Sequence, residues 1–120
     1  MSEELSRLTT HEDLKVWQDS IELAKEIYTV TNQFPESEKF GLISQMRRAV
    51  VSIPSNIAEG AARNSKKEFI QFLYIALGSI AELETQIILA YEFGYLNSKS
   101  NEILIRIKRM VIGLIKSLKK

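Results

Sequence analysis

The chain has 120 residues, a length typical of one domain, and its hydrophobic content of 45% is sufficient for a single core. It has no cysteine and one histidine, His11, which excludes disulfides, thiolate metal sites and histidine-rich metal centres. Sixteen basic and fifteen acidic residues leave a net charge of +1, so the chain is neither uniformly basic nor acidic. We therefore expect one domain over residues 1–120 and no cofactor.

The first ten residues, MSEELSRLTT, are polar and acidic and lack the apolar segment of a signal peptide. We expect them to be frayed. A continuous run of 18 apolar residues is also missing from the chain, which predicts no membrane-spanning segment. The expected location is the cytoplasm.

The first predicted helix covers residues 11–33, with Thr10 as its N-cap and Pro35 after its end. Two rows of apolar residues run along it at helical spacing. One row includes Trp17 and Tyr28, which we interpret as core residues. The second row lies beside it and consists of Val16, Leu23, Ile27, Val30 and Phe34.

The second predicted helix begins near Ser37 and stops at about Gly60, and it contains Pro54. A proline inside a helix removes one backbone hydrogen bond and clashes with the preceding turn. The helix is therefore predicted to be kinked or restarted there. Short polar residues that could bond the freed carbonyls surround the proline: Ser52, Ser55 and Asn56.

The third and fourth predicted helices follow from capping signals. Ser65 and Glu68 form a capping box, and Gly94 supplies a left-handed stop after Phe93. Asn97 or Ser98 is expected to cap the last helix, which continues to Leu118. Period-2 alternation is not sustained anywhere, so the fold class is all-α. Short connections predict an antiparallel up-down-up-down four-helix bundle.

The third helix is apolar on every side, which predicts that it is buried on every side. A lone bundle leaves each helix one face in water, so the surplus apolar surface favours a homo-oligomer. The alternative is that scattered exposed leucines and isoleucines need no partner. Gly78 and Gly113 are interpreted as places where helices approach closely.

Charge is divided unevenly along the chain. Residues 1–34 hold three basic and seven acidic side chains, a net −4, whereas residues 97–120 hold seven basic and one acidic, a net +6. On the last helix the cations Arg106, Arg109 and Lys116 lie opposite the apolar face. In an oligomer such stripes would combine into a polyanion-binding surface. The alternative is a solvated face whose cations favour the helix C-terminus.

The sequence contains no constellation that supports catalysis. A di-iron bundle needs Glu-x-x-His motifs, which are missing, and there is no phosphate-binding glycine loop. Glu59 and Glu82 could face each other across the second and third helices, but we interpret them as part of a polar network rather than a metal site. The residues with a predicted structural or interface role are Pro54, Asn56, Glu59, Gly60, Gly78, Ser79 and Glu82.

Five blocks of sequence carry a resemblance to a known family. The longest is QMRRAVVSIPSNIAEG at residues 45–60, and the others are LKVW at 14–17, FP at 34–35, SKKEF at 65–69 and ALGSIAELET at 76–85. The closing segment GLIKSL at 113–118 is similar too. Together they resemble the bacterial four-helix-bundle proteins encoded by intervening sequences within 23S rRNA genes.

The resemblance implies a ring-like homopentamer without known enzymatic activity. A related branch, the accessory proteins of diversity-generating retroelements, implies that a basic barrel of this kind can bind nucleic acid, although those relatives are more basic than this chain. If RNA or DNA is bound, the expected phosphate contacts are Arg47, Arg48, Arg106, Arg109 and Lys116. The alternative function is a protein-interaction scaffold with no nucleic-acid ligand. Neither a membrane nor a small-molecule substrate is an expected partner.

Overall fold

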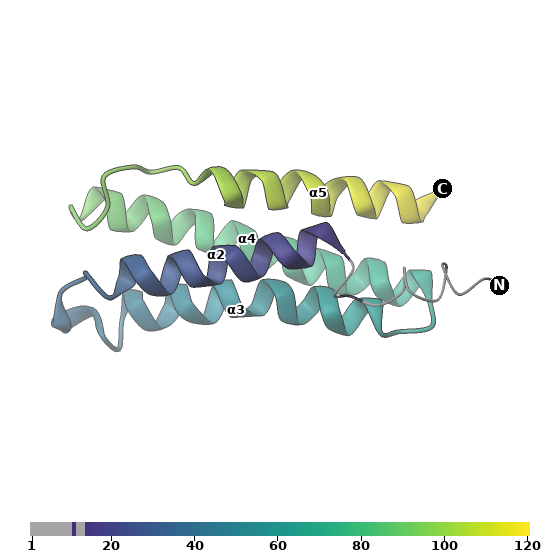
Figure 1. The fold of residues 1–120 in the computed structure, drawn as a ribbon, viewed down its shortest axis with the longest axis horizontal. Coiled ribbons are helices and arrows are strands. Elements are labelled where there is room, and N and C mark those ends of the chain that lie inside the picture. The colour runs from purple at the N-terminus through teal and green to yellow at the C-terminus, as the bar shows by residue number, and fades with distance from the viewer. Residues whose placement is uncertain (1–10, 12–13) are drawn as a thin grey trace.

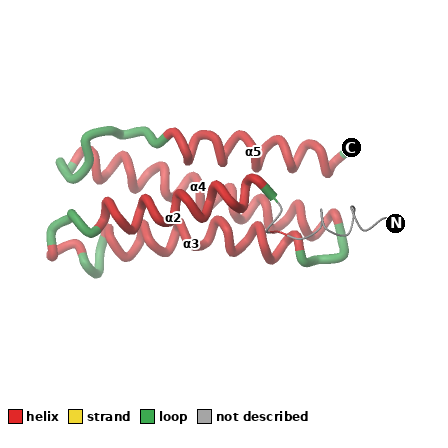
Figure 2. The backbone as a smooth tube through the Cα atoms, in the orientation of Figure 1, coloured by secondary structure: helices red, strands yellow, loops and turns green. Residues whose placement is uncertain are grey.

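A computed structural model describes residue 11 and residues 14–120. These residues form four α-helices, α2 (Lys15–Thr31), α3 (Leu42–Ala61), α4 (Lys66–Glu92) and α5 (Glu102–Lys119), and one short 3-10 helix, η2 (Glu36–Glu38) (Figure 1). Helix and loop account for the whole described part, with no strand (Figure 2). The predicted all-α fold is confirmed. The predicted cap at Thr10 and the frayed segment 1–10 lie outside the described residues.

The four helices pack side by side as a bundle. The turns between α2 and α3 and between α4 and α5 lie at one end, and the turn between α3 and α4 lies at the other, near the end of α5 (Figure 1). Helix α3 packs against α2 and α4, and α5 packs against the same two helices. Consequently α3 and α5 lie diagonally opposite each other, and a surface on one is separate from a surface on the other.

Two helix starts differ from the expected positions. Asn101, rather than Asn97 or Ser98, caps α5, because its Oδ1 accepts a hydrogen bond from the Leu104 amide at 3.0 Å. The chain after Phe34 first forms η2, and α3 begins only at Leu42, whose amide donates to Glu38 Oε1 at 3.1 Å.

At the ends of α4 the predicted stop is present and one half of the predicted capping box, since the Glu68 carboxylate faces Arg63 instead of the Ser65 amide. Ser65 Oγ accepts a hydrogen bond from the Glu68 amide at 3.2 Å at the helix start. After the helix Gly94 has a φ of 84°, the left-handed conformation that glycine adopts without strain. The Tyr95 amide donates to the Ala90 carbonyl and the Gly94 amide to the Tyr91 carbonyl, which together form a Schellman motif.

Helix α3 is continuous through Pro54, so it is not restarted there. Ser55 Oγ donates to the Val51 carbonyl at 2.8 Å, and Asn56 Nδ2 donates to the Ser52 carbonyl at 2.9 Å. Neither acceptor is the Val50 carbonyl, which has no helical donor because Pro54 lacks an amide hydrogen. The prediction that these side chains bond the carbonyl freed by the proline is therefore wrong. The kink itself stays a prediction.

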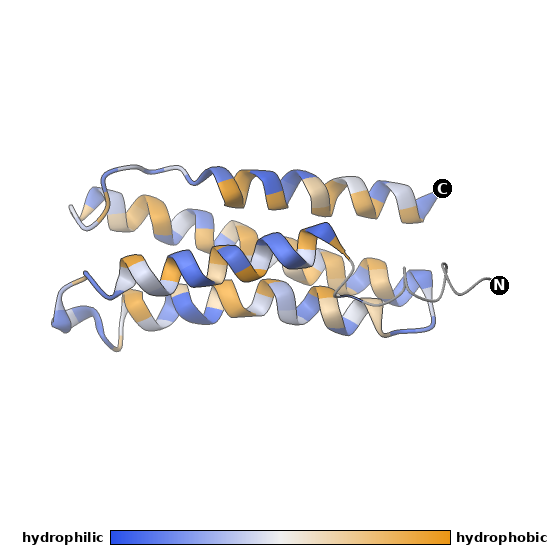
Figure 3. Ribbon diagram, in the orientation of Figure 1, coloured by the Kyte–Doolittle hydropathy of each residue, from blue (hydrophilic) through white to orange (hydrophobic). Residues whose placement is uncertain are grey.

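The core of α2 lies on the second of the two predicted apolar rows. Val16, Leu23 and Ile27 are buried, whereas Trp17 is half-buried and Tyr28 is 41% exposed. The interpretation of Trp17 and Tyr28 as core residues is thus wrong for Tyr28. Blue and orange alternate along α2 and α5, as expected of helices with one buried face (Figure 3). The buried core that they form with the other helices includes Met46, Val50, Ile53, Ile57, Leu73, Ile80, Leu83, Leu104, Ile107 and Val111.

Helix α3 ends at Ala61, one residue after Gly60, as expected. Among the glycines described, Gly60 is the one at which α3 and α4 approach each other closely. A Cβ at this position would lie 2.7 Å from Phe72 Cβ and 2.9 Å from Phe69 Cδ1. The Phe72 Cβ belongs to a rigid part of the side chain, so it cannot move aside without the helix. Gly60 is therefore required by packing rather than by a turn.

Gly60→Ala is expected to lower the free energy of unfolding by roughly 1–3 kcal/mol, because the added methyl group forces α3 and α4 apart. Gly113→Ala is the matched control. No atom of the described residues, apart from the glycine's own helical turn, lies within 4 Å of a Cβ at Gly113, so alanine should stabilise α5 by about 1 kcal/mol. Chemical denaturation followed by circular dichroism measures both; equal effects of the two substitutions would contradict the close approach.

Candidate assembly and nucleic-acid surfaces

The outer face of α4 is apolar and exposed. Its large side chains are Tyr74, Ile75, Ile88 and Leu89, with exposed fractions between 41% and 51%. The small residues Gly78 and Ala81, also exposed, lie between these two pairs. We call this set of six residues the α4 outer face. In the described part of the chain, outside Gly78's own helical turn, nothing lies within 4 Å of a Cβ at Gly78, so the close approach predicted there does not occur within one chain.

Among the described helices, α4 alone has the length and apolar composition to cross a membrane. That property is weak evidence, because a core helix of a globular protein meets the same criterion. One side of α4 is also buried against α3 and α5 through Leu73, Ala76, Ile80 and Leu83. The expectation that no segment spans a membrane stays a prediction.

A small polar network joins α3 to α4. Ser52 Oγ and Ser79 Oγ are 2.7 Å apart, and Asn56 Nδ2 donates to Ser52 Oγ at 2.9 Å. Asn56 and Ser79, two of the residues with a predicted structural role, are thus joined through Ser52 rather than through a glutamate. Ser52, which joins them, is the member that sequence reasoning assigned only to the carbonyls near Pro54.

Glu59 and Glu82 do not belong to this network and do not face each other. Glu59 is exposed and lies 3.8 Å from Arg63, which follows the end of α3. Glu82 is exposed near Arg48 and Gln45, at the opposite part of the helix pair. Within the described residues no three histidine, aspartate or glutamate side chains gather as a metal site would require.

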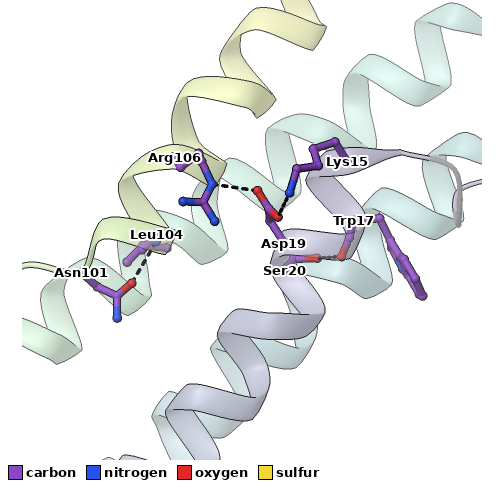
Figure 4. A network of polar contacts seen from close by, with 7 residues as sticks. All are labelled: Lys15, Trp17, Asp19, Ser20, Asn101, Leu104 and Arg106. Carbon is purple, nitrogen blue, oxygen red and sulfur yellow. Dashed lines mark hydrogen bonds and ion pairs between the residues drawn. The ribbon is translucent and has the colours of Figure 1, made fainter.

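A buried carboxylate links α2 to α5. Asp19 is 3% exposed, and its two oxygens accept hydrogen bonds from Lys15 Nζ and from Arg106 Nε, the latter at 2.9 Å (Figure 4). Burial acts to raise the pKa of Asp19, but the hydrogen bonds and positive charges of Lys15 and Arg106 outweigh it. The pKa of this carboxyl is therefore lowered from its ordinary value. Asp19 was not among the residues singled out from the sequence. The signal that could have found it is the opposite net charge of the first and last predicted helices, which favours an ion pair between them.

Two of the five predicted phosphate contacts are engaged inside the chain. Arg106 holds Asp19, as described. Arg47 Nε donates to Thr31 Oγ1 at 3.0 Å, its Nη2 donates to Asn32 Oδ1 at 3.0 Å, and its guanidinium lies 4.5 Å from the Tyr28 ring centre. Both arginines therefore stabilise contacts between helices or helix ends of the chain itself, whether or not they also contact a ligand.

The other three predicted contacts, Arg48, Arg109 and Lys116, are exposed and have no ion-pair or hydrogen-bond partner in the part of the chain described. Arg48 lies on α3, and Arg109 and Lys116 lie on α5. Because α3 and α5 are diagonally opposite, one chain does not bring these cations to a single surface. The α5 cations form one exposed basic face, together with Lys120 and the outward edge of Arg106.

The fold and its surfaces define a small four-helix bundle with an exposed apolar face on one helix, where Tyr74 contacts Lys119, and a basic face on another. The chain belongs to the 23S rRNA-intervening sequence protein family, whose sequence model matches residues 12–117. This confirms the family inferred from the five sequence blocks.

A solved structure from Bacteroides thetaiotaomicron is similar to this chain. It is described as a protein with unknown function from the S23 ribosomal protein family. The two share 28% identity with a TM-score of 0.60, and the match covers 86% of this chain and 94% of that one. No curated protein matches the chain. The family therefore brings a fold but no assigned reaction.

Asp19→Asn is expected to lower the free energy of unfolding at neutral pH by roughly 1–3 kcal/mol, because it removes a charged acceptor from Lys15 and Arg106. Since folding lowers the pKa of Asp19, its stabilisation is present above about pH 4 and is lost as the pH falls through the folded pKa. The substituted chain should therefore lose less stability than the parent chain on acidification from pH 5.

Denaturation at a series of pH values measures this difference. Glu22→Gln is the control, because it removes the same charge from α2 at an exposed position 3.8 Å from Lys25. Exposed pairs contribute little, so this control should behave as the parent chain does. Parallel acid profiles for the parent chain and Asp19→Asn would show that the buried pair does not act as described.

Proposed function

We propose that the chain functions as a non-enzymatic homo-oligomer that assembles through the α4 outer face and binds RNA or another nucleic acid through the basic face of α5. The observation that carries the proposal is the α4 outer face itself. Four large apolar side chains are exposed on one side of this helix, as two pairs with Gly78 and Ala81 between them, and exposed apolar surface concentrated in this way usually marks an interaction site.

Gly78 supports self-assembly. A glycine in a helix interior is less favourable than alanine by about 1 kcal/mol, and the space beside it is open in the single chain. A neighbouring copy could place its own helix there and bury Ile75 and Leu89 on either side. The family resemblance supports five copies, and a ring requires each contact to join two different faces of adjacent copies.

The α5 face supports nucleic-acid binding. Arg109 and Lys116 are exposed and unpaired within the described residues, and Glu102 at the first turn is the one acidic residue of the helix. Oligomerisation would repeat this face in every copy and add the charges. Contacts of this kind are made to phosphates, so we propose positioning on a nucleic-acid backbone without sequence readout.

A protein-interaction scaffold is the second candidate function. It is favoured by the internal engagement of Arg47 and Arg106, which reduces the number of free cations available to a polyanion. Under this alternative the α5 face only keeps the assembly soluble. Both functions place the protein in the cytoplasm, where the apolar residues of α4 are covered by a neighbouring copy rather than by lipid.

Ile75→Glu is expected to dissociate the assembly, because it puts a charge into the centre of the apolar contact, which would leave that charge buried without a partner. Sedimentation equilibrium measures the mass. We expect five chains for the parent protein and a smaller species for the variant. Thr29→Glu adds the same charge to an exposed position on α2 and should leave the mass unchanged. A monomeric parent protein at micromolar concentration would contradict self-assembly.

The double substitution Arg109→Glu and Lys116→Glu is expected to weaken binding of a structured RNA strongly. These two positions are chosen over Arg106, because reversing Arg106 would also break the contact with Asp19. Gel shifts at several salt concentrations provide the measurement. The slope of log affinity against log salt should fall by about 0.7–0.9 for each phosphate that the variant no longer neutralises.

The matched control is Lys25→Glu with Lys66→Glu, which makes the same change in charge at exposed positions on α2 and α4. It should retain most of the affinity. Equal affinities for the parent protein and the α5 double variant would favour the scaffold.

A further inference from the structure

A groove between α2 and the start of α3 has an apolar surface that the proposed function does not use. Its volume is about 620 Å³, and it is lined in part by Tyr28, Phe40 and Val51. The ring of Phe40 is 89% exposed, the highest exposure among the large hydrophobic residues described, and Tyr28 and Val51 are also more than two-fifths exposed. An aromatic ring so fully hydrated contributes little to the stability of the chain.

The charged residues that line the same groove are all cations: Lys39, Arg47 and Arg48. Among its described lining residues there is no carboxylate. Lys39 Nζ lies 5.5 Å from the centre of the Phe40 ring, and Arg48 has no partner within the described chain. Arg47 is held in place by Thr31 and stacks on Tyr28, so its charge stays at the groove without a counter-ion.

We infer that this groove binds unpaired nucleotides, with a base stacked on the Phe40 ring and the adjacent phosphates beside Lys39 and Arg48. Exposed rings next to unpaired cations match the two parts of a single-stranded nucleic acid, the flat base and the anionic backbone. A base in a duplex has both faces covered, so a double strand could contact the cations but not the ring. The inference rests on the proposed function and adds a ligand class to it.

The groove is separate from the basic face of α5. It lies between α2 and α3, and α5 is diagonally opposite α3 in the bundle. The two surfaces therefore suit ligands of different chemistry. Helix α5 presents cations alone, whereas the groove combines cations with aromatic rings. An acidic peptide would satisfy the cations of the groove equally well but would gain nothing from the flat face of Phe40.

Binding of three fluorescent probes to the full chain tests the inference: a 12-nucleotide oligo(U), an oligo(dT) of the same length and a duplex of the same length. Phe40→Leu is expected to weaken both single strands by roughly tenfold, because stacking on an aromatic ring is lost, and to leave the duplex unchanged. Phe40→Trp retains a flat ring and should restore the parent affinity. The ratio of oligo(U) to oligo(dT) affinity reports whether RNA or DNA is the preferred source of the base.

Phe93→Leu is the matched control, because Phe93 is also exposed but does not line the groove. It should leave all three affinities unchanged. As a direct readout, photocrosslinking of an oligonucleotide that carries 5-iodouracil should attach to Phe40 or Tyr28. Polyglutamate of equal charge should compete poorly with oligo(U).

Three results would overturn the inference. In the first, Phe40→Leu leaves single-strand binding intact while the α5 double variant abolishes it, which leaves the proposed function in place. In the second, polyglutamate competes as well as oligo(U), which assigns the groove to an acidic protein. In the third, Phe40→Leu lowers the mass of the assembly, which assigns the groove to a contact between copies. Absence of binding by every probe at low salt would overturn both proposals.

Discussion

The packing of α3 against α4 is the contact on which the other surfaces of the molecule depend. Gly60 allows the two helices to approach until a Cβ would lie 2.7 Å from Phe72, and further along, the Ser52–Ser79 hydrogen bond fixes their register. Helix α4 is apolar on its other sides as well. Once α3 covers one side and α5 another, the large apolar residues Tyr74, Ile75, Ile88 and Leu89 stay exposed, together with polar residues such as Glu82 and Thr85. The α4 outer face therefore follows from how α4 is held.

Helix α5 is attached to α2 partly by charge. Asp19 on α2 binds Arg106, and Glu26 on α2 accepts a hydrogen bond from Asn101, the residue that caps α5. The acidic first part of the chain and its basic end thus have a structural role, since the buried carboxylate of Asp19 is held by the side chains of Arg106 and Lys15, which are 52% and 68% exposed. Since Arg106 is paired with Asp19, the α5 cations that remain free to bind a ligand are chiefly Arg109 and Lys116.

The sequence was sufficient for the all-α fold, the four helices and the capping signals at Ser65 and Gly94, because these depend on local periodicity and local hydrogen bonds. It was not sufficient where several local solutions compete. Asn97, Ser98 and Asn101 are all good N-caps, and only the contact of Asn101 with Glu26 on another helix distinguishes them. The two apolar rows of α2 are adjacent, and the buried polar residues Asp19 and Thr31, whose partners lie on α5 and α3, decide which one faces the core.

The same distinction explains why the candidate sites were only partly predictable. A cation can be found in a sequence, but whether it is free depends on partners far along the chain. Arg47 binds Thr31 and Arg106 binds Asp19, whereas Arg48 has no hydrogen-bond or ion-pair partner among the described residues. Helix α2 does not pack against α4, so the α4 outer face and the groove between α2 and α3 lie on different parts of one chain. Because a ring joins the α4 outer face of one copy to a different face of the next, self-association and nucleotide binding use separate surfaces only where that second face lies outside the groove.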